Sequence, residues 1–323
     1  MTPALIRARD LSKSFERGSA GWFGRARSPV WAVRGVSLDV YPGETYGLVG
    51  ESGSGKSSLG RLMLRLVAPD MGTVEFDGKD ITHSSARELR PLRRRMQIIF
   101  QDPYSSLNPR MTVRDTLAEP LRVHRIVVGQ KEVEERVRQL AERVGLRADQ
   151  LDRYPHEFSG GQRQRIGIAR ALALRPDFVV CDEPVSALDV SIQAQILNLL
   201  QDLQQELGVA YLFVSHDLRV VEHVAHRVGV MYRGRIVEEG PTRELYARPA
   251  HPYTRRLLAA IPSFDTSRSL PIVLDAPERA RSQGCSYAPH CDRFRPGTCD
   301  AESPSLIPIA DAPTHQVACY FPG

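Results

Sequence analysis

One short stretch of the sequence carries residues suited to holding a polyphosphate. It runs from Gly50 to Ser58, reads GESGSGKSS, and has the spacing G-x-x-x-x-G-K-S. Glycines let the backbone N–H groups of such a loop turn toward an anion, and a following helix adds the positive end of its dipole. Lys56 is then expected to reach the β- and γ-phosphates of a nucleotide, and the Ser57 hydroxyl to bind Mg²⁺. The predicted ATP-binding residues are Gly50, Glu51, Ser52, Gly53, Ser54, Gly55, Lys56, Ser57 and Ser58.

The sequence on either side gives this loop the context that the motif requires. The apolar run 45–49 follows Pro42-Gly43 and predicts a buried strand. After the loop, apolar residues recur at helical spacing and predict a helix that continues to Pro69. A strand, a glycine loop and a helix in this order make a chance glycine-rich turn the poorer interpretation.

A second predicted strand ends in two acids. In the run 178–184, FVVCDEP, Asp182 is placed to hold Mg²⁺ through water. Glu183 beside it is the candidate base that deprotonates the attacking water. An Asp-Glu pair alone is more typical of a helix cap, but the phosphate loop elsewhere in the chain favours the nucleotide role.

A third apolar strand, 209–216, ends at His216. Apolar strands that alternate with helical segments predict an α/β fold with a largely parallel sheet. Ligands bind at the carboxyl ends of such strands, where Gly50, Asp182 and His216 all fall. Residues from about 102 to 175 break this alternation and are predicted to be mostly helical.

Composition limits the class of protein. The chain has 323 residues, of which 42% are hydrophobic and 25% charged, and this is ordinary for a globular protein. Its apolar runs are too short for a transmembrane helix, and its charged N-terminus differs from a signal peptide. We therefore expect a cytosolic protein. The net charge of +5 is compatible with a nucleic acid or an anionic membrane nearby but requires neither.

Six motifs, in the correct order, resemble those of ATP-binding-cassette (ABC) ATPases over nearly all of residues 5–250. Besides the phosphate loop, they are the signature FSGGQRQR with Ser159, Gly160, Gly161 and Gln162, the Q-loop Gln101 in IIFQDP, the D-loop Asp189 in SALD, His216 in SHD, and Phe15 in LSKSF. The resemblance implies an ABC-type P-loop NTPase in residues 1–250. Its expected parts are a mostly parallel core sheet, an antiparallel β subdomain, and a helical subdomain at about 102–175.

The resemblance also implies roles. Two chains are expected to close head-to-tail, so that the signature of one contacts the ATP held by the phosphate loop of the other. His216 would bond a γ-phosphate oxygen and Phe15 would stack on adenine. Gln101, Ser57 and Asp182 would hold Mg²⁺. Catalysis is assigned to Glu183, His216 and Gln101.

Three stretches narrow the resemblance to the oligopeptide/dipeptide importer ATPases, closest to the second of the two ATPases paired in such systems. They are residues 101–113, 182–204 and the HPYTRRLLAAIP segment 251–262. The implied function is ATP-driven import of di- or oligopeptides from the cytoplasmic face of the membrane. The implied partners are a paralogous ATPase, two permease subunits and an extracytoplasmic peptide-binding protein. Relatives of this subfamily also import nickel, opines, glutathione and oligosaccharides.

Rival functions within the same superfamily are an exporter ATPase and a non-transport ATPase that acts on nucleic acid. The chain has one cassette rather than two, and it lacks a zinc-finger insertion or a long charged linker. These features weigh against the nucleic-acid role, so no nucleic-acid partner is expected. The HPYT segment weighs against the exporter by resemblance.

The last segment, 251–323, is predicted to be a separate, irregular, proline-rich extension. Cys285, Cys291, Cys299 and Cys319 give the spacing C-x5-C-x7-C-x19-C. A cytosolic location argues against disulfides, and four thiolates suit a [4Fe–4S] cluster or tetrahedral zinc. The absence of C-x2-C pairs disfavours zinc, and free thiols remain an alternative. GCSYAPHC and VACYF also resemble cysteine motifs of peptide-importer ATPases in which a cluster occurs in some members.

Overall fold

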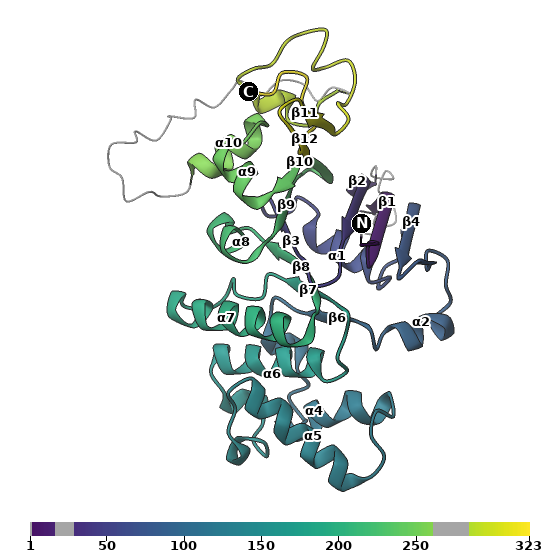
Figure 1. Cartoon of the computed structure of the whole chain (residues 1–323), viewed down its shortest axis with the longest axis vertical. Coiled ribbons are helices and arrows are strands. Elements are labelled where there is room, and N and C mark those ends of the chain that lie inside the picture. Colours follow the sequence, from purple (N-terminus) through teal and green to yellow (C-terminus); the bar gives the residue numbers. More distant parts are fainter. Residues whose placement is uncertain (1, 17–28, 261–283) are drawn as a thin grey trace, which may run out of the picture. The chain divides into compact units, whose positions relative to one another are not determined.

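The computed structural model describes residues 2–16, 29–260 and 284–323 (Figure 1). The chain forms two compact units, each interrupted in sequence. Unit 1 comprises Met1–Ile6, Asp39–Glu44 and Glu75–Val214, and unit 2 comprises Arg7–Leu38, Thr45–Val74 and Ser215–Gly323. The sequence predicts a polar, glycine-rich loop between Phe15 and Val30 with Trp22 and Phe23 at its tip, and most of this loop lies outside the described residues.

Unit 1 combines a parallel sheet with a helical region. In chain order its elements are β5 (Lys79–Asp80), α2 (Ala86–Leu92), β6 (Met96–Ile99), α3 (Pro103–Ser106), α4 (Val113–Val123), α5 (Gln130–Arg143), η1 (Ala148–Gln150), η2 (Pro155–Glu157), α6 (Gly160–Leu172), β7 (Phe178–Asp182), α7 (Val190–Leu207) and β8 (Ala210–Ser215). Strand β7 pairs in parallel with β6 on one side and with β8 on the other. Both β7 and β8 are buried throughout, which explains their unbroken apolar sequences.

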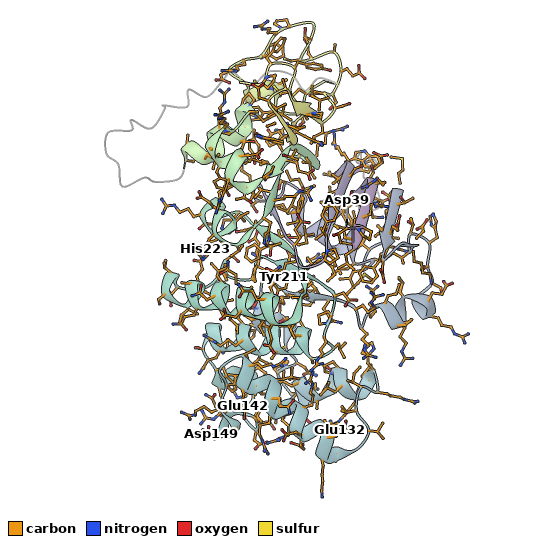
Figure 2. All side chains as sticks on the ribbon, in the orientation of Figure 1. Asp39, Glu132, Glu142, Asp149, Tyr211 and His223 are labelled. Atoms are coloured by element: carbon orange, nitrogen blue, oxygen red, sulfur yellow. The ribbon has the colours of Figure 1, made fainter. Side chains whose placement is uncertain are left out.

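Helices hold this sheet and the helical region together. The buried stripe of α5 consists of Val133, Val137, Leu140 and Ala141, as its spacing predicts. Helix α7 ends at Gly208, which takes the left-handed φ of 68° that suits glycine. Tyr211 of β8, labelled in Figure 2, donates its hydroxyl to the carbonyl of Leu200 in α7 at 3.2 Å. This buried hydrogen bond stabilises the packing of α7 against β8.

Unit 2 contains the phosphate loop and the C-terminal residues. Its elements are β1 (Ile6–Phe15), β2 (Val30–Val40), β3 (Thr45–Val49), α1 (Lys56–Met63), β4 (Met71–Phe76), α8 (Leu218–Val224), β9 (Arg227–Tyr232), β10 (Arg235–Pro241), α9 (Thr242–Ala247), α10 (Pro252–Ala259), η3 (Ala288–His290), β11 (Ile307–Ile309) and β12 (Ala312–Val317). A few end residues of β1, β2 and β4 belong to unit 1. Strands β2, β1 and β4 are neighbours in one small sheet.

The larger sheet of unit 2 has the order β11-β12-β10-β9-β3. Strands β3 and β9 are parallel, whereas β9–β10, β10–β12 and β12–β11 are antiparallel. The α/β class is therefore confirmed. The C-terminal segment, expected to be irregular and separate, instead contributes two strands to this sheet, because β12 pairs along β10.

One predicted boundary is wrong. The helix after the phosphate loop ends at Met63 rather than continuing to Pro69. Arg65 takes a left-handed φ of 52°, which an α-helix cannot contain, and Leu66 is 47% exposed. Apolar spacing alone does not reveal a left-handed residue.

Over the described residues, no helix is both long and apolar enough to cross a membrane.

Candidate active site

The phosphate loop has the geometry that its sequence predicts. It joins buried strand β3 to helix α1, and Gly55 is the N-cap of that helix with φ 108°. A Cβ atom on Gly55 would lie 2.0 Å from the carbonyl oxygen of Ala32, and one on Gly50 would lie 2.2 Å from that of Met231. Both positions therefore need glycine, because neighbouring backbone occupies the space of a side chain.

Lys56 lies against its own loop. Its side chain is buried, and its Nζ donates to the carbonyl oxygens of Gly50 at 2.8 Å and Glu51 at 3.0 Å. The ammonium group is thus held within the loop that precedes α1, next to the helix N-terminus. A fixed positive charge at a helix N-terminus is suited to a phosphate.

A hydroxyl from the C-terminal part of the chain also contacts the loop. The N–H of Glu51 donates to the hydroxyl of Tyr253, in α10, at 3.0 Å. Sequence reasoning missed this residue, since a contact between positions 202 apart leaves no local pattern. The only available signal was the resemblance of the segment 251–262 to the importer ATPases.

Two members of the predicted catalytic set meet in unit 1. The side-chain amide of Gln101, just after β6, donates to a carboxylate oxygen of Glu183 at 2.9 Å. Glu183 follows β7 and has a left-handed φ of 47°, which is costly for a residue with a side chain. Its N–H donates to the carbonyl of Val214 at 3.0 Å, which holds the turn in place. Asp182, the last residue of β7, is buried.

The signature begins helix α6 rather than preceding it. Gly160 and Gly161 already form the first turn of this helix. Ser159 is the N-cap: its hydroxyl accepts from the N–H of Gln162 at 3.4 Å, and its own N–H donates to the Gln162 side chain at 3.0 Å. This capping box orders the helix N-terminus at which an anion is expected.

The signature, at the start of α6, packs closely against the start of α7, the helix that follows Glu183. A Cβ on Gly161 would lie 2.4 Å from Cγ2 of Ile192, in α7. Asp189 is the N-cap of α7 but makes no side-chain capping bond there. The hydroxyl of Ser186 donates to the carbonyl of Glu183 at 3.1 Å. The signature, the D-loop and the candidate base thus belong to one packed region of unit 1.

The remaining predicted nucleotide contacts belong to unit 2. His216 directly follows β8 and is exposed. Phe15, at the end of β1, is 44% exposed, with the ammonium of Lys13 at 5.8 Å from its ring centroid. An exposed ring face of this kind is available for stacking. The structure thus brings Gln101 and Glu183 together in unit 1, and Lys56 and the phosphate loop together in unit 2. The nucleotide roles of these residues, and of His216 and Phe15, stay predictions.

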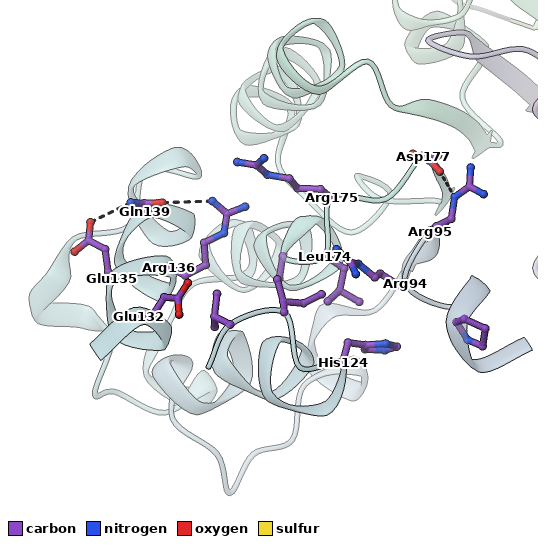
Figure 3. A pocket seen from close by; sticks show the side chains of 14 residues that line it. Arg94, Arg95, His124, Glu132, Glu135, Arg136, Gln139, Leu174, Arg175 and Asp177 are labelled. Atoms are coloured by element: carbon purple, nitrogen blue, oxygen red, sulfur yellow. Dashed lines mark hydrogen bonds and ion pairs between the residues drawn. The ribbon is translucent and has the colours of Figure 1, made fainter. Parts of the chain in front are cut away.

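A basic cavity of about 890 Å³ lies in the helical region of unit 1 (Figure 3). Its charged and polar lining residues are Arg94, Arg95, His124, Glu132, Glu135, Arg136, Gln139, Arg175 and Asp177. Arg95 is paired with Asp177. Burial, with Arg175 and Arg143 nearby, lowers the pKa of Arg136, and burial with Arg90 and Arg94 lowers that of His124. Burial and nearby arginines therefore disfavour the cationic state of Arg136 and His124. The pKa of Arg95, in contrast, is raised, because hydrogen bonds to Asp177 and Asp77 outweigh the effect of burial.

Burial and neighbouring thiols affect the pKa of three of the four C-terminal cysteines. Burial raises the pKa of Cys285, Cys291 and Cys319, and neighbouring thiols of the same set raise each of them further. The N–H of Cys285 donates to the carbonyl of Cys299 at 2.8 Å. Within residues 2–16, 29–260 and 284–323, however, no group of three or more His, Cys, Asp or Glu side chains is arranged to hold a metal ion. Cys181 lies inside β7 and is fully buried, as expected of a core residue.

Comparison with known proteins finds two family matches. The family described as ABC transporter matches residues 33–186, and the family described as Oligopeptide/dipeptide transporter, C-terminal region, matches residues 237–299. A relative from Sinorhizobium fredii, "Probable peptide ABC transporter ATP-binding protein y4tS", is 48% identical, covering 99% of this chain and 90% of its own length. The glutathione import ATP-binding protein GsiA of Salmonella paratyphi A is 56% identical over 83% of this chain. The chain spans only 42% of the length of that relative.

Solved structures share the fold. The dimeric post-hydrolysis state of the ATP-binding cassette MJ0796, bound to ADP and Pi, has a TM-score of 0.66 and 28% identity. It covers 74% of this chain and 99% of its own. CbiO1 from Clostridium perfringens, part of the transporter complex cbiONQ, has a TM-score of 0.64 and 27% identity, covering 76% of this chain and 91% of its own.

Proposed function

This chain belongs to the ATP-binding proteins of peptide-type ABC transporters, and on that premise we propose how its residues serve ATP-driven import. It is the ATP-hydrolysing subunit of an importer of the peptide/dipeptide type. The observation that carries the mechanism is the bond between Gln101 and Glu183. It orients the carboxylate of Glu183, a residue with a left-handed backbone, directly after the acidic end of β7.

In this mechanism Glu183 accepts a proton from the water that attacks the γ-phosphate. Lys56 neutralises charge on the β- and γ-phosphates, and His216 donates to a γ-phosphate oxygen. Mg²⁺ is expected for an ABC ATPase, and oxygen ligands from Ser57, Gln101 and Asp182 suit this hard cation. Bound there, the ion would screen the phosphate charge. The motifs support this assignment of ligands.

We further propose that a complete site needs a second ATPase chain. The ordered N-terminus of α6, with Ser159 as its cap and Gly160, Gly161 and Gln162 in its first turn, then contacts the ATP of the partner. Phe15 stacks on adenine, and Asp189 lies at the junction between the two chains. The partner is a paralogous ATPase, as in systems that pair two such subunits.

The basic cavity in unit 1 supports a proposal for the permease contact. It lies in the helical region that begins directly after Gln101, so a segment bound there is connected in sequence to the nucleotide residues. Its four arginines outnumber its three carboxylates. Burial, with Arg175 and Arg143 nearby, disfavours the charge on Arg136, so an acidic group of a partner would be favoured beside it. We assign it to a cytoplasmic segment of a permease subunit, which places the chain peripherally at the cytoplasmic membrane face.

The cargo is assigned at the level of class. The peptide name of the S. fredii relative and the C-terminal family match support di- or oligopeptides. The GsiA relative supports glutathione, itself a small peptide, as the main alternative. Two permeases and an external binding protein would select the cargo.

The experiment that tests this function is a pull-down from native membranes with tagged Glu183→Gln, ATP and Mg²⁺, followed by mass spectrometry. Recovery of two permeases, a second cassette ATPase and a solute-binding protein supports the importer assembly, and that binding protein can then be screened with peptides and glutathione. Recovery of nucleic-acid-bound proteins instead would contradict the transport role.

We also propose that Cys285, Cys291, Cys299 and Cys319 hold a structural [4Fe–4S] cluster. The support is chemical: the segment carries four thiols, and in three of them burial and then neighbouring thiols of the set raise the pKa. The segment is joined to the rest of unit 2 through β12. Holding a cluster would require these thiols to rearrange and lose their protons. Protein purified anaerobically should then contain iron and sulfide and absorb near about 400 nm. A colourless, iron-free protein from iron-replete cells would contradict the cluster.

A further inference from the structure

One peptide unit of the phosphate loop is held from both of its ends. The carbonyl of Gly50 accepts from Lys56 Nζ at 2.8 Å. The N–H of Glu51 belongs to the same peptide unit and donates to the Tyr253 hydroxyl at 3.0 Å. Because a peptide unit is planar, its carbonyl and N–H turn together. A rotation that breaks the bond to Tyr253 therefore also moves the Gly50 oxygen, one of the two carbonyl oxygens that hold Lys56.

Tyr253 is itself held firmly. Its side chain is 1% exposed, and its ring lies 4.6 Å from the ring of Tyr232 and 5.5 Å from that of Tyr287, measured between centroids. Its N–H donates to Nδ1 of His251, the N-cap of α10, at 3.0 Å. The Tyr253 hydroxyl that accepts from the phosphate loop therefore belongs to a well-packed ring in the capped first turn of α10.

Residues of strands β10 and β12 stabilise the N-terminus of helix α10. Glu238 of β10 is fully buried, and its carboxylate accepts from the N–H groups of Ala250 at 2.7 Å and His251 at 2.9 Å. The same carboxylate lies 2.7 Å from Nε2 of His315, in β12. Contacts therefore run without a break from β12 to the phosphate loop.

We propose that Tyr253 is a positioning residue for nucleotide binding: its hydroxyl sets the orientation of the Gly50–Glu51 peptide and, through it, the position from which Lys56 meets the β- and γ-phosphates. Tyr253 touches neither nucleotide nor water in this role. The C-terminal segment thereby contributes to the ATP site through the shape of the loop. Without the hydroxyl, the peptide turns more freely and Lys56 loses a fixed acceptor.

The test compares Tyr253→Phe with Tyr232→Phe, which removes a hydroxyl from the neighbouring ring of the same cluster. Both variants of the full-length chain are titrated with a fluorescent ATP analogue and Mg²⁺, and thermal unfolding without nucleotide checks that both are folded. We expect Tyr253→Phe to weaken ATP binding about fivefold, as for the loss of one hydrogen bond, and Tyr232→Phe to bind within about twofold of wild type. Hydrogen exchange of the Glu51 amide should be slow in wild type and in Tyr232→Phe, and fast in Tyr253→Phe.

Three results would overturn the proposal. Tyr253→Phe with wild-type affinity would show that the bond does not act on the nucleotide. Equal weakening in both variants would assign the effect to aromatic packing. A rapidly exchanging Glu51 amide in the wild-type protein would show that the bond does not form, and this measurement decides the question even if Tyr253→Phe fails to fold.

Discussion

The Nε2 of Gln101 donates to Glu183 at 2.9 Å, so the Q-loop residue holds the candidate base by its side chain. The bond uses the amide nitrogen of Gln101 and not its amide oxygen, which is the atom proposed to bind Mg²⁺. Glu183 also has a left-handed backbone conformation. A residue kept in such a conformation, with its carboxylate held by a second residue, is typical of a functional site.

Glu183→Gln should retain ATP binding and lose hydrolysis by about 10²- to 10⁴-fold, because the amide cannot accept a proton from water. ATP-dependent dimerisation should persist, since the ATP is no longer consumed. Phosphate release by the assembled transporter measures turnover, and size-exclusion chromatography measures the dimer. Glu206→Gln is the matched control, because Glu206 lies in α7 and pairs with Arg143. Wild-type turnover by Glu183→Gln would remove Glu183 as the base.

Lys56→Ala should weaken Mg·ATP binding by at least about tenfold, because the phosphates lose a buried counter-charge. Equilibrium titration with a fluorescent ATP analogue measures the effect. Lys131→Ala removes an exposed lysine from α5 and should bind ATP normally. Equal affinity in the two variants would refute the assignment of the phosphate loop.

The stability of the protein should fall in mild acid because of His251. Burial lowers the pKa of His251 to about 4, against a smaller opposing effect of Glu238, and Arg255 lowers it further. The unfolded chain, with an ordinary histidine pKa of about 6.5, therefore binds a proton that the folded chain excludes. The free energy of unfolding should decrease by about 2 kcal/mol between pH 7 and pH 5 from this residue alone.

Urea unfolding at pH 7 and pH 5 measures this loss in wild type and in His251→Asn. The asparagine oxygen can still accept from the N–H of Tyr253, but the side chain cannot take up a proton. The variant should therefore lose about 2 kcal/mol less than wild type over this interval. An equal loss in both proteins would show that other groups cause the acid sensitivity.

Gly161→Ala should destabilise unit 1, because the new methyl would meet Ile192 at 2.4 Å. We expect a cost of about 1–3 kcal/mol, as for an overpacked core. Gly160→Ala is the neighbouring control, since its methyl would lie 3.5 Å from Leu188, an ordinary contact. Urea unfolding of the two variants compares them. A Gly160→Ala variant as unstable as Gly161→Ala would contradict the packing argument.

Motifs and apolar spacing in the sequence predicted those parts of the structure that are formed by residues close together in the chain. The phosphate loop, the acidic end of β7 and the apolar stripe of α5 are of this kind. The helix after the loop was predicted too long because the left-handed Arg65 carries no composition signal. The pairing of Gln101 with Glu183 and the contact of Tyr253 with Glu51 join residues far apart in the chain. Such contacts depend on the folded sheet and helices.

The C-terminal strands also determine how the larger sheet of unit 2 ends. Strand β12 covers the outer edge of β10, pairing Val317 with Glu238 and Gln316 with Glu239. In the described residues, the edge strand beyond β12 is β11, which is only three residues long, Ile307–Ile309. Its central residue, Pro308, has no backbone N–H that could donate a hydrogen bond to another strand. A long open strand invites pairing with another molecule, whereas a short one with proline resists it. Removing the last residues would therefore uncover the edge of β10 and favour aggregation.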